Sequence, residues 1–483
     1  MGTMEQKLSY LLGTKNAIKE AIASKGVKIT DDVTFRDYAD KIMEIRGKEY
    51  YVPSVSSKGG VDFYDYDGGI LHSYTKDEFL ALSEMPSLPE RLGLVCQGWN
   101  YSLEDAKAYV EEYGVLHIGA MYITDDGKTR FYIIVDSPFA AEVPLYFNVS
   151  TPNSLVIDWG DGKKEPITGS GDLNVSHKYE EAGDYVIAFE VVEGTIVEFY
   201  NAIFGSNTVY VNMLKKVEIG NSVTSIGYRA FQSCYSLSSI VIPQGVTSIG
   251  NSAFYDCHSL SFIVIPQGVT KIYDSAFYGC YSLSSIVIPQ GVTSIGRYTF
   301  QSCYSLSSIV IPQGVTTIDA NVFSNCYSLS SIVIPQGVTS IGNSAFYYCY
   351  SLSSIVIPQG VTSIGNSTFS FCYSLSSIVL SQGVTSIGSQ AFVNCYSLSS
   401  IVIPQSVTKI NSGAFSSCDS LVIVDFSEST SVPTLSSTNA IPTHAAIRTI
   451  IPDDLYDTWI AATNWSSHAS RIIKKSVWDA SQA

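Results

Sequence analysis

The chain has 483 residues, of which 46% are hydrophobic and 15% charged, and its formal net charge is −16. This length exceeds what one compact core accommodates, so we expect several units or an extended array of repeats. The acidic balance, without a cluster of lysine and arginine, argues against nucleic acid as a partner, because phosphate binding needs such clusters. No apolar run approaches the roughly 20 residues that cross a bilayer, so no membrane insertion is expected.

Residues 1–47 are expected to form an N-terminal helical segment. Apolar residues recur at helical spacing from Leu8 to Ile22, and Gly26 is suited to end the helix. Thr34 can cap a second helix with one apolar face. Two such short helices bury little surface alone, so the segment either covers the next domain or packs on a partner protein.

The same segment carries a pattern of Thr-Lys, Ala-Ile, Lys-Gly-Val and Phe-x-x-Tyr-Ala-x-Lys-Ile. The matching residues are Thr14-Lys15, Ala17-Ile18, Lys25-Gly26-Val27, Phe35, Tyr38, Ala39, Lys41 and Ile42. The pattern resembles the N-terminus of many phage and prophage tail proteins. The resemblance implies a virion tail protein, made in the bacterial host cytoplasm, whose N-terminal helices bind other tail or baseplate proteins. Tail fibres are commonly trimers, so a homo-oligomer fits this interpretation, although no heptad run enforces one.

Residues 48–60 have the composition of a linker, and residues 61–128 predict a small α+β domain. Alternating apolar residues on both sides of Asp67-Gly68-Gly69 indicate a hairpin, and two helices follow. Ser102 is the expected N-cap of the second helix. Three side chains of this domain are expected to pack and not to react: His72, Cys96 and His117.

Residues 129–205 carry the successive motifs W-G-D-G, H-x-Y and G-x-Y-x-V. The matching residues are Trp159 to Gly162, His177 and Tyr179, then Gly183, Tyr185 and Ile187, where isoleucine replaces valine. The motifs resemble the PKD-type immunoglobulin-like β-sandwich, which implies a spacer module. Asp158 and Asp161 could hold a cation, but acidic turn residues more often accept hydrogen bonds from backbone amides, so no metal site is predicted.

A 23-residue repeat fills residues 206–430. Ten leucines mark its units: Leu214, Leu237, Leu260, Leu283, Leu306, Leu329, Leu352, Leu375, Leu398 and Leu421. A fixed period of this length indicates a solenoid, in which each coil buries its apolar side by stacking on the next. Within one coil, Ile240 and Ile242 are expected to point inward and Val241 outward, as in a strand.

The repeat reads L-x-x-I-x-I-P-x-x-V-x-x-I-G-x-x-x-F-x-x-C and resembles the BspA-like leucine-rich repeats of bacterial surface adhesins. The resemblance implies a parallel sheet on one face and a role in recognition. Residues 431–483 resemble the C-terminal cap of that family, with a helix that starts near Asp453 and covers the last coil. The predicted fold is therefore multidomain α+β: N-terminal helices, a small α+β domain, a PKD-type sandwich and a capped solenoid.

Nine of the ten cysteines fall at one position of the repeat. They are Cys234, Cys257, Cys280, Cys303, Cys326, Cys349, Cys372, Cys395 and Cys418. Neighbouring coils could bring pairs within disulfide distance. An odd number, parallel side chains and a reducing cytoplasm instead favour a structural ladder of buried thiols. A spacing of 23 residues also does not supply the four clustered ligands of a zinc site.

The array offers an almost uncharged surface. Between Cys234 and Cys418 the charges are Asp256, Lys271, Asp274, Arg297, Asp319 and Lys409. Seven tyrosines recur beside serines: Tyr235, Tyr281, Tyr304, Tyr327, Tyr350, Tyr373 and Tyr396. Aromatic rings with neutral hydroxyls suit a sugar polymer, which makes these tyrosines the candidate ligand-binding residues. The alternative is that they only stabilise the coils by stacking.

A protein ligand would instead meet the residues that vary between coils. These include Arg297, Tyr298, Asp319, Asn321 and Phe371. No catalytic motif, phosphate loop or pair of positioned carboxylates is found, so neither an enzyme nor a cofactor is expected. The leading hypothesis is a phage tail-fibre or receptor-binding protein that recognises a glycan or protein on a bacterial surface. The alternatives are a BspA-like bacterial adhesin and a structural virion decoration protein.

Overall fold

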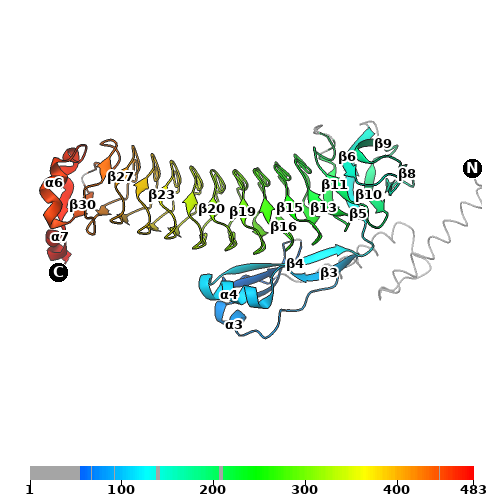
Figure 1. Cartoon of the computed structure of the whole chain (residues 1–483), viewed down its shortest axis with the longest axis horizontal. Coiled ribbons are helices and arrows are strands. Elements are labelled where there is room, and N and C mark those ends of the chain that lie inside the picture. Colours follow the sequence, from blue (N-terminus) through cyan, green and yellow to red (C-terminus); the bar gives the residue numbers. More distant parts are fainter. Residues whose placement is uncertain are drawn as a thin grey trace, which may run out of the picture.

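The computed structural model describes residues 55–66, 68–91, 93–136, 142–205, 210, 212–444 and 446–482. The helices predicted for residues 1–47 lie outside these ranges. The described part is mostly β and is dominated by a solenoid of stacked coils (Figure 1). A small α+β domain lies along one side of the solenoid, a β-sandwich lies at one end, and short helices lie at the other end.

The small domain has one four-stranded sheet in the order β2-β1-β4-β3. Its elements are β1 (Val61–Tyr64), β2 (Ile70–Tyr74), α3 (Lys76–Leu80), β3 (Leu94–Trp99), α4 (Leu103–Tyr113) and β4 (Leu116–Thr124). Ser102 caps α4 as predicted, because its side chain accepts a hydrogen bond from the Asp105 amide. Helix α3 has a full capping box between Thr75 and Glu78, which the sequence analysis missed.

Seven strands form the sandwich, which follows the small domain in the sequence and precedes the solenoid. They are β5 (Thr129–Val135), β6 (Glu142–Val149), β7 (Leu155–Asp158), β8 (Lys164–Ile167), β9 (Gly171–Lys178), β10 (Gly183–Val191) and β11 (Val197–Phe199). One layer has the order β8-β7-β10-β5, and the other has the order β9-β6-β11. Alternating buried residues of β5 and β6 face one another across the core.

Both layers of the sandwich continue into the solenoid. Strand β5 pairs with β12 (Leu214–Glu218), and β11 pairs with β13 (Val223–Ile226). One uninterrupted hydrophobic core runs from Phe131 in the sandwich to Ile472 near the C-terminus. The sandwich therefore closes the N-terminal end of the solenoid. The first coil completes both sheets of the sandwich, and the spacer role of the sandwich stays a prediction.

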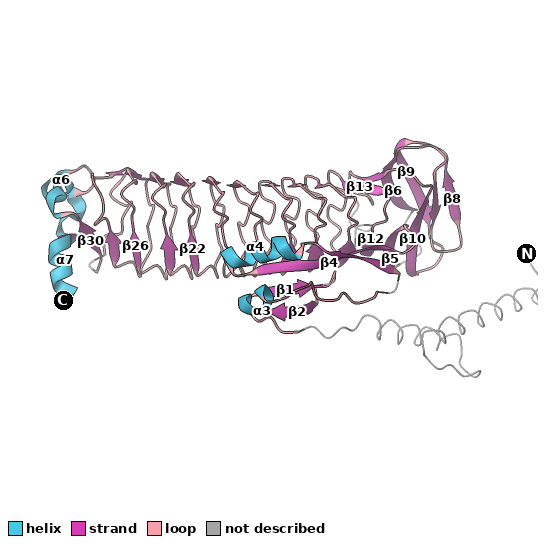
Figure 2. Ribbon diagram, turned by 60° about the horizontal axis from the view of Figure 1, so that its bottom comes forward, coloured by secondary structure: helices cyan, strands magenta, loops and turns pink. Residues whose placement is uncertain are grey.

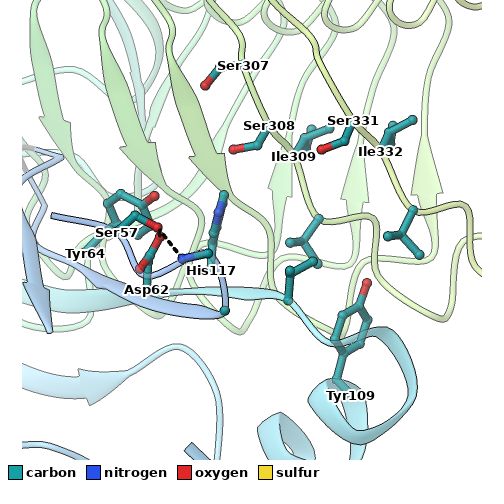
Figure 3. Close-up of a pocket in the computed structure, with 15 residues that line it drawn as sticks. Ser57, Asp62, Tyr64, Tyr109, His117, Ser307, Ser308, Ile309, Ser331 and Ile332 are labelled. Carbon is teal, nitrogen blue, oxygen red and sulfur yellow. Dashed lines mark hydrogen bonds between the residues drawn. The ribbon is translucent and has the colours of Figure 1, made fainter. Parts of the chain in front are cut away.

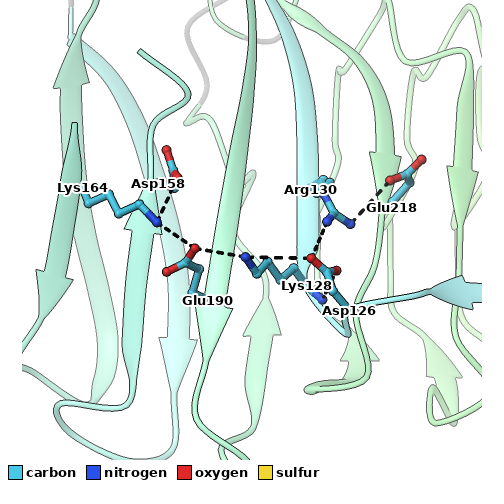
Figure 4. A network of polar contacts seen from close by, with 7 residues as sticks. All are labelled: Asp126, Lys128, Arg130, Asp158, Lys164, Glu190 and Glu218. Carbon is cyan, nitrogen blue, oxygen red and sulfur yellow. Dashed lines mark hydrogen bonds and ion pairs between the residues drawn. The ribbon is translucent and has the colours of Figure 1, made fainter. Parts of the chain in front are cut away.

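A row of alternating charges crosses the outer face of this junction (Figure 4). Lys164 and Lys128 both contact Glu190, with N–O distances of 2.8 and 3.0 Å. Arg130 then joins Asp126 at 2.6 Å and Glu218 of β12 at 4.0 Å. The row links three strands of the sandwich to the first coil. Exposed ion pairs of this kind contribute little free energy individually, so the shared sheets and core hold the junction.

Each coil of the solenoid contributes a short strand to a back sheet, and most coils also contribute one to a front sheet. In the two coils between β18 and β22, the front side is paired only by an isolated bridge between Val310 and Val333. The front strands are β14 (Ser239–Val241), β16 (Phe262–Val264), β18 (Ser285–Val287), β22 (Ser354–Val356), β24 (Ser377–Val379), β26 (Ser400–Val402) and β28 (Ile423–Asp425). The back strands after β13 are β15 (Ser248–Ile249), β17 (Lys271–Ile272), β19 (Ser294–Ile295), β20 (Thr317–Ile318), β21 (Ser340–Ile341), β23 (Ser363–Ile364), β25 (Ser386–Ile387), β27 (Lys409–Ile410) and β29 (Thr434–Leu435). Paired residues of adjacent coils are 23 positions apart, for example Ile286 opposite Ile263.

The third side of each coil, which we call the return segment, consists of turns. Its amides also bond to the next coil, as when the Phe254 amide donates to the Ala276 carbonyl at 2.8 Å. Inside, phenylalanines from Phe231 to Phe415 stack with ring centroids 5.0–5.7 Å apart. The return segments are therefore irregular, and their aromatic core residues form a continuous column.

The last coil is followed by a compact group of short elements. These are β30 (Arg448–Ile451), η1 (Asp453–Leu455), α6 (Tyr456–Ala461), η2 (Ser466–Arg471), β31 (Ile472–Lys474) and α7 (Lys475–Gln482). Strands β30 and β31 extend the front sheet. Trp459 and Trp465 are fully buried, with ring centroids 5.3 and 5.5 Å from that of Phe426. The two tryptophans pack on Phe426 at the C-terminal end of the hydrophobic core, and the cap role of residues 431–483 stays a prediction.

The small domain is docked on the front sheet (Figure 2). The Tyr64 ring stacks on Phe262 of β16 with centroids 5.2 Å apart. The Tyr101 hydroxyl donates to the Ile288 carbonyl at 3.0 Å, and the Tyr109 hydroxyl of α4 donates to the Ile311 carbonyl at 3.2 Å. A Cβ added at Gly119 would lie 2.7 Å from Val264 Cγ1, so this glycine allows β4 to approach the sheet closely.

The docked domain divides the front sheet into a covered and an open part. One valine of each front strand from β14 to β26 points outward, as predicted for Val241. These valines are buried beneath the small domain at positions 241, 264, 287 and 310, with exposed fractions of at most 7%. In the coils that we call the open coils, Val356, Val379 and Val402 are 58%, 54% and 59% exposed. A repeated position therefore has two different environments along one sheet.

This difference predicts opposite responses to one substitution. Val287→Asp places an unpaired carboxylate under the docked domain and is expected to destabilise the protein by about 3 kcal/mol or more. Val356→Asp, at the same position of an open coil, is expected to cost less than about 0.5 kcal/mol. Chemical denaturation of the two variants, with limited proteolysis to detect a released small domain, checks the prediction. Equal losses of stability would contradict the docked arrangement.

Candidate functional site: the outer surfaces of the solenoid

The described residues contain no group of three or more histidine, cysteine or acidic side chains arranged to hold a metal ion. In the sandwich, Asp158 accepts a hydrogen bond from the Gly160 amide and Asp161 accepts one from the Lys163 amide, each at 3.0 Å. Asp161 also lies 2.8 Å from His177 Nε2. These are the contacts expected of acidic turn residues. Within the same described ranges, no helix combines the length and apolar character that a bilayer span requires.

All nine repeat cysteines are free and buried in the solenoid. From Cys257 to Cys418, each Sγ lies 3.0–3.2 Å from the carbonyl oxygen of the phenylalanine 26 residues earlier. Burial raises the pKa of the thiols from Cys234 to Cys395 above the ordinary value. The cysteines are therefore small core residues with weak donors, and their thiolates are disfavoured.

Thiol labelling tests this arrangement. Of the ten cysteines, only Cys96 is exposed. The native protein is expected to react with one equivalent of a thiol reagent at pH 8, and the denatured protein with ten. Cys96→Ser should abolish the native reaction, because the remaining thiols are buried and excluded from water. Rapid native labelling of several cysteines would show that the ladder opens to solvent.

The seven predicted tyrosines form one stacked ladder on the outside of the return segments. From Tyr281 to Tyr396, consecutive ring centroids are 4.7–5.0 Å apart and the rings are nearly parallel. His258 occupies the same position in its coil and stacks between Tyr235 and Tyr281. The sequence analysis missed this histidine, although the segment "CHSL" aligns with "CYSL" of the other coils.

Stacking restricts what the tyrosine ladder can bind. Each inner ring has both faces covered by its neighbours, so a sugar cannot stack on an individual face. The hydroxyl edges remain available as a regular row. Burial, and after it the neighbouring tyrosine, raises the pKa of Tyr281, Tyr327, Tyr350 and Tyr373. The row therefore presents neutral hydroxyls that donate and accept hydrogen bonds, and its role in binding stays a prediction.

A second aromatic group, the aromatic patch, comprises Tyr347, Tyr348 and Phe371 on two adjacent return segments. The Tyr348 ring lies 4.2 Å from Tyr347 and 4.4 Å from Phe371, measured between centroids. The patch adjoins the tyrosine ladder, since Tyr348 is 5.5 Å from Tyr350. Burial, and after it a hydrogen bond with Tyr348, raises the pKa of Tyr347 to about 12. All three side chains are half-buried.

The backbone beneath this patch is strained. Tyr348 and Phe371 have φ values of 61° and 62°, in the left-handed region. The other coils place small or polar residues here: Ser233, Asp256, Gly279, Ser302, Asn325, Asn394 and Ser417. Their amides bond to the next coil, Tyr348 to the Ser370 carbonyl and Phe371 to the Val393 carbonyl, which fixes the conformation. A bulky residue in this region costs about 1–2 kcal/mol, and such strain often accompanies functional sites.

The remaining candidate residues are dispersed. Arg297 and Tyr298 are exposed on one return segment, and Asp319 and Asn321 lie on the next. In the small domain, His72 Nε2 lies 3.1 Å from the Ser87 carbonyl, and His117 lies at the junction with the solenoid. Only Phe371 of the varied residues joins another candidate group. The sequence signal for the patch was an aromatic side chain where neighbouring coils carry serine or asparagine.

The stacked coils, parallel sheets and internal ladders define a leucine-rich-repeat solenoid. Residues 202–330 and 316–437 match the family model described as BspA type leucine rich repeat region. This part of the protein therefore consists of BspA-type leucine-rich repeats, as the sequence predicted. The comparisons show neither a phage tail protein nor a PKD-type domain. A comparison with curated proteins found no match.

Several solved leucine-rich-repeat proteins are similar to this chain. A protein from Bacteroides ovatus is 26% identical with a TM-score of 0.36, over 53% of this chain and 76% of its own. A T. pallidum protein is 30% identical with a TM-score of 0.32, over 42% and 82%. A leucine rich cell surface protein from Faecalibacterium prausnitzii is 26% identical with a TM-score of 0.35, over 66% and 97%.

Proposed function

We propose that this protein is a non-catalytic recognition protein that presents its BspA-type solenoid to a ligand on a bacterial surface. The observation that carries the proposal is the aromatic patch of Tyr347, Tyr348 and Phe371. Two adjacent coils accept backbone strain to hold aromatic rings at the surface, where every other coil has a small or polar residue. Stability alone does not favour that choice, so contact with a ligand is its best explanation.

The surroundings of the patch indicate the chemistry of the ligand. The tyrosine ladder supplies neutral hydroxyls on one side, and the open coils supply exposed valines and serines on the front sheet. The six formal charges between Cys234 and Cys418 cancel. A neutral glycan or an uncharged face of a surface protein suits this region, because long-range electrostatic attraction contributes nothing.

Two biological settings place such a protein at a bacterial surface. The N-terminal resemblance to tail proteins supports a phage tail-fibre or receptor-binding protein, held on the virion by other tail or baseplate proteins. The BspA-type repeats support a bacterial surface adhesin at least as well. The comparisons with known proteins match the repeats and not the N-terminal segment. In both settings the solenoid is the recognition element. A virion decoration protein would need no such strained surface patch.

The aromatic patch can be removed without disturbing the coil. Tyr348→Asn with Phe371→Asn restores the residue type of the neighbouring coils, which tolerates a positive φ. Relief of strain and loss of ring packing oppose one another, so stability should stay within about 1 kcal/mol of the wild type. Binding of the purified protein to cell envelopes, from a panel of bacteria that includes potential hosts, should fall at least about tenfold.

The matched control is Tyr298→Asn. Tyr298 also has a positive φ and is exposed, but it lies two coils away from the patch and makes no aromatic contact with it. This variant should bind as the wild type does. If the double variant also binds normally, the patch is not the site. If the wild-type protein binds no envelope, the recognition function itself is wrong.

Location distinguishes the two settings. Antibodies to the solenoid should label tails of purified phage particles if the protein is a tail fibre, and intact bacterial cells if it is an adhesin. Electron microscopy of both samples, with a deletion strain as the control, reads out the result. Labelling of neither sample would contradict both settings.

A further inference from the structure

A cleft of about 360 Å³ lies at the junction of the small domain and the solenoid (Figure 3). The small domain contributes Asp62, Tyr64 and His117, and the solenoid contributes serines 308 and 331 on the front side of two successive coils. Figure 3 shows the two groups facing one another across the opening. The size lies in the range of small-ligand pockets.

The cleft contains a buried polar atom without a partner. His117 Nδ1 is shielded from solvent and makes no hydrogen bond within the described structure. Burial lowers the pKa of His117, so its imidazole is neutral near pH 7 and offers one donor and one acceptor. Leaving such an atom unsatisfied is unfavourable. A ligand hydroxyl that enters the cleft would supply the missing partner.

The neighbouring groups are also suited to hydroxyls. Asp62 accepts hydrogen bonds from the Ser57 and Ser73 hydroxyls at 2.6 and 2.5 Å, which hold its carboxylate in place. Ser308 and Ser331 can donate to or accept from a ligand. Among the described residues that line the cleft there is no lysine or arginine, so these residues offer no positive charge with which to bind an anion. The Tyr64 ring contributes an apolar wall beside His117, with centroids 5.2 Å apart.

The cleft leads onto the uncovered part of the front sheet. An adjacent groove of about 420 Å³ shares Ser331 and Val333 with it and continues over Ser354 and Val356 of the first open coil. The two hollows together extend over successive coils. A chain of linked units can therefore place one unit in the cleft while the next units lie along the sheet.

We propose that the cleft binds a neutral saccharide unit, and that the rest of the glycan follows the groove onto the open coils. This inference rests on the proposed recognition function and names its ligand class. Sugar hydroxyls match the mixture of carboxylate, imidazole and serine groups, and the apolar C–H face of a sugar ring matches the tyrosine and valine surfaces.

The repeat supplies a matched pair of variants for the test. Ser331→Leu fills the cleft, whereas Ser377→Leu makes the same change at the same repeat position in an open coil beyond both hollows. His117→Phe keeps an aromatic ring but removes both nitrogens. The probes are neutral trisaccharides of glucose, galactose, mannose or N-acetylglucosamine, titrated into the full-length protein and followed by saturation-transfer NMR. Thermal unfolding verifies that each variant is folded.

We expect at least one trisaccharide to bind, with an affinity that falls at least tenfold in Ser331→Leu and His117→Phe and is unchanged in Ser377→Leu. Equal binding by all variants, or binding of none of the trisaccharides, would overturn the proposal. The envelope assay separates this failure from failure of the proposed function. If Ser331→Leu and His117→Phe still bind bacterial envelopes as the wild type does, recognition stands and the cleft is not its site.

Discussion

The structure depends on the stacking of one coil on the next. No single 23-residue coil can bury its isoleucines, phenylalanine and cysteine alone, and each acquires a core only between two neighbours. The same constraint applies at both ends. The sandwich satisfies it by adding β5 and β11 to the two sheets, and Trp459 and Trp465 satisfy it by covering the last coil. Stacking also determines the surface of the solenoid, because outward side chains at the same repeat position line up in a row from coil to coil.

Residues at one repeat position form a row along the solenoid, and members of the same row differ in exposure where another part of the protein covers some of them. The outward valines occupy equivalent positions, but four of them are buried under the docked domain, Val333 is half-buried, and three are exposed. The tyrosines form a continuous stack in which neighbouring rings cover the ring faces, while the hydroxyl groups stay accessible. Positions where one coil departs from the repeat sequence coincide with the domain interface and with the aromatic patch. Phe262 occupies a position that is serine in the neighbouring coils, and its ring stacks on Tyr64. Tyr348 and Phe371 occupy a position where the other coils have small or polar residues.

Much of the solenoid could be predicted from sequence, since its period, inward residues and buried cysteines are local consequences of the repeat. The docking of the small domain could not be predicted. It depends on contacts between residues about 190 to 200 positions apart, such as Tyr101 with Ile288, which no local pattern encodes. The fusion of sandwich and solenoid was missed for the same reason. For the candidate sites, the tyrosines were evident, whereas the His117 cleft exists only because two distant segments meet.

The division of the front sheet has a consequence for how such a protein can change. Insertion or deletion of a whole 23-residue unit among the open coils preserves every sheet register and every internal column. It leaves the small domain and its interface untouched, because those contacts end near Ile311. The length of the uncovered face can therefore vary in steps of one coil while the anchored part stays constant. A protein built in this way can adjust its reach along a polymer without redesigning its fold.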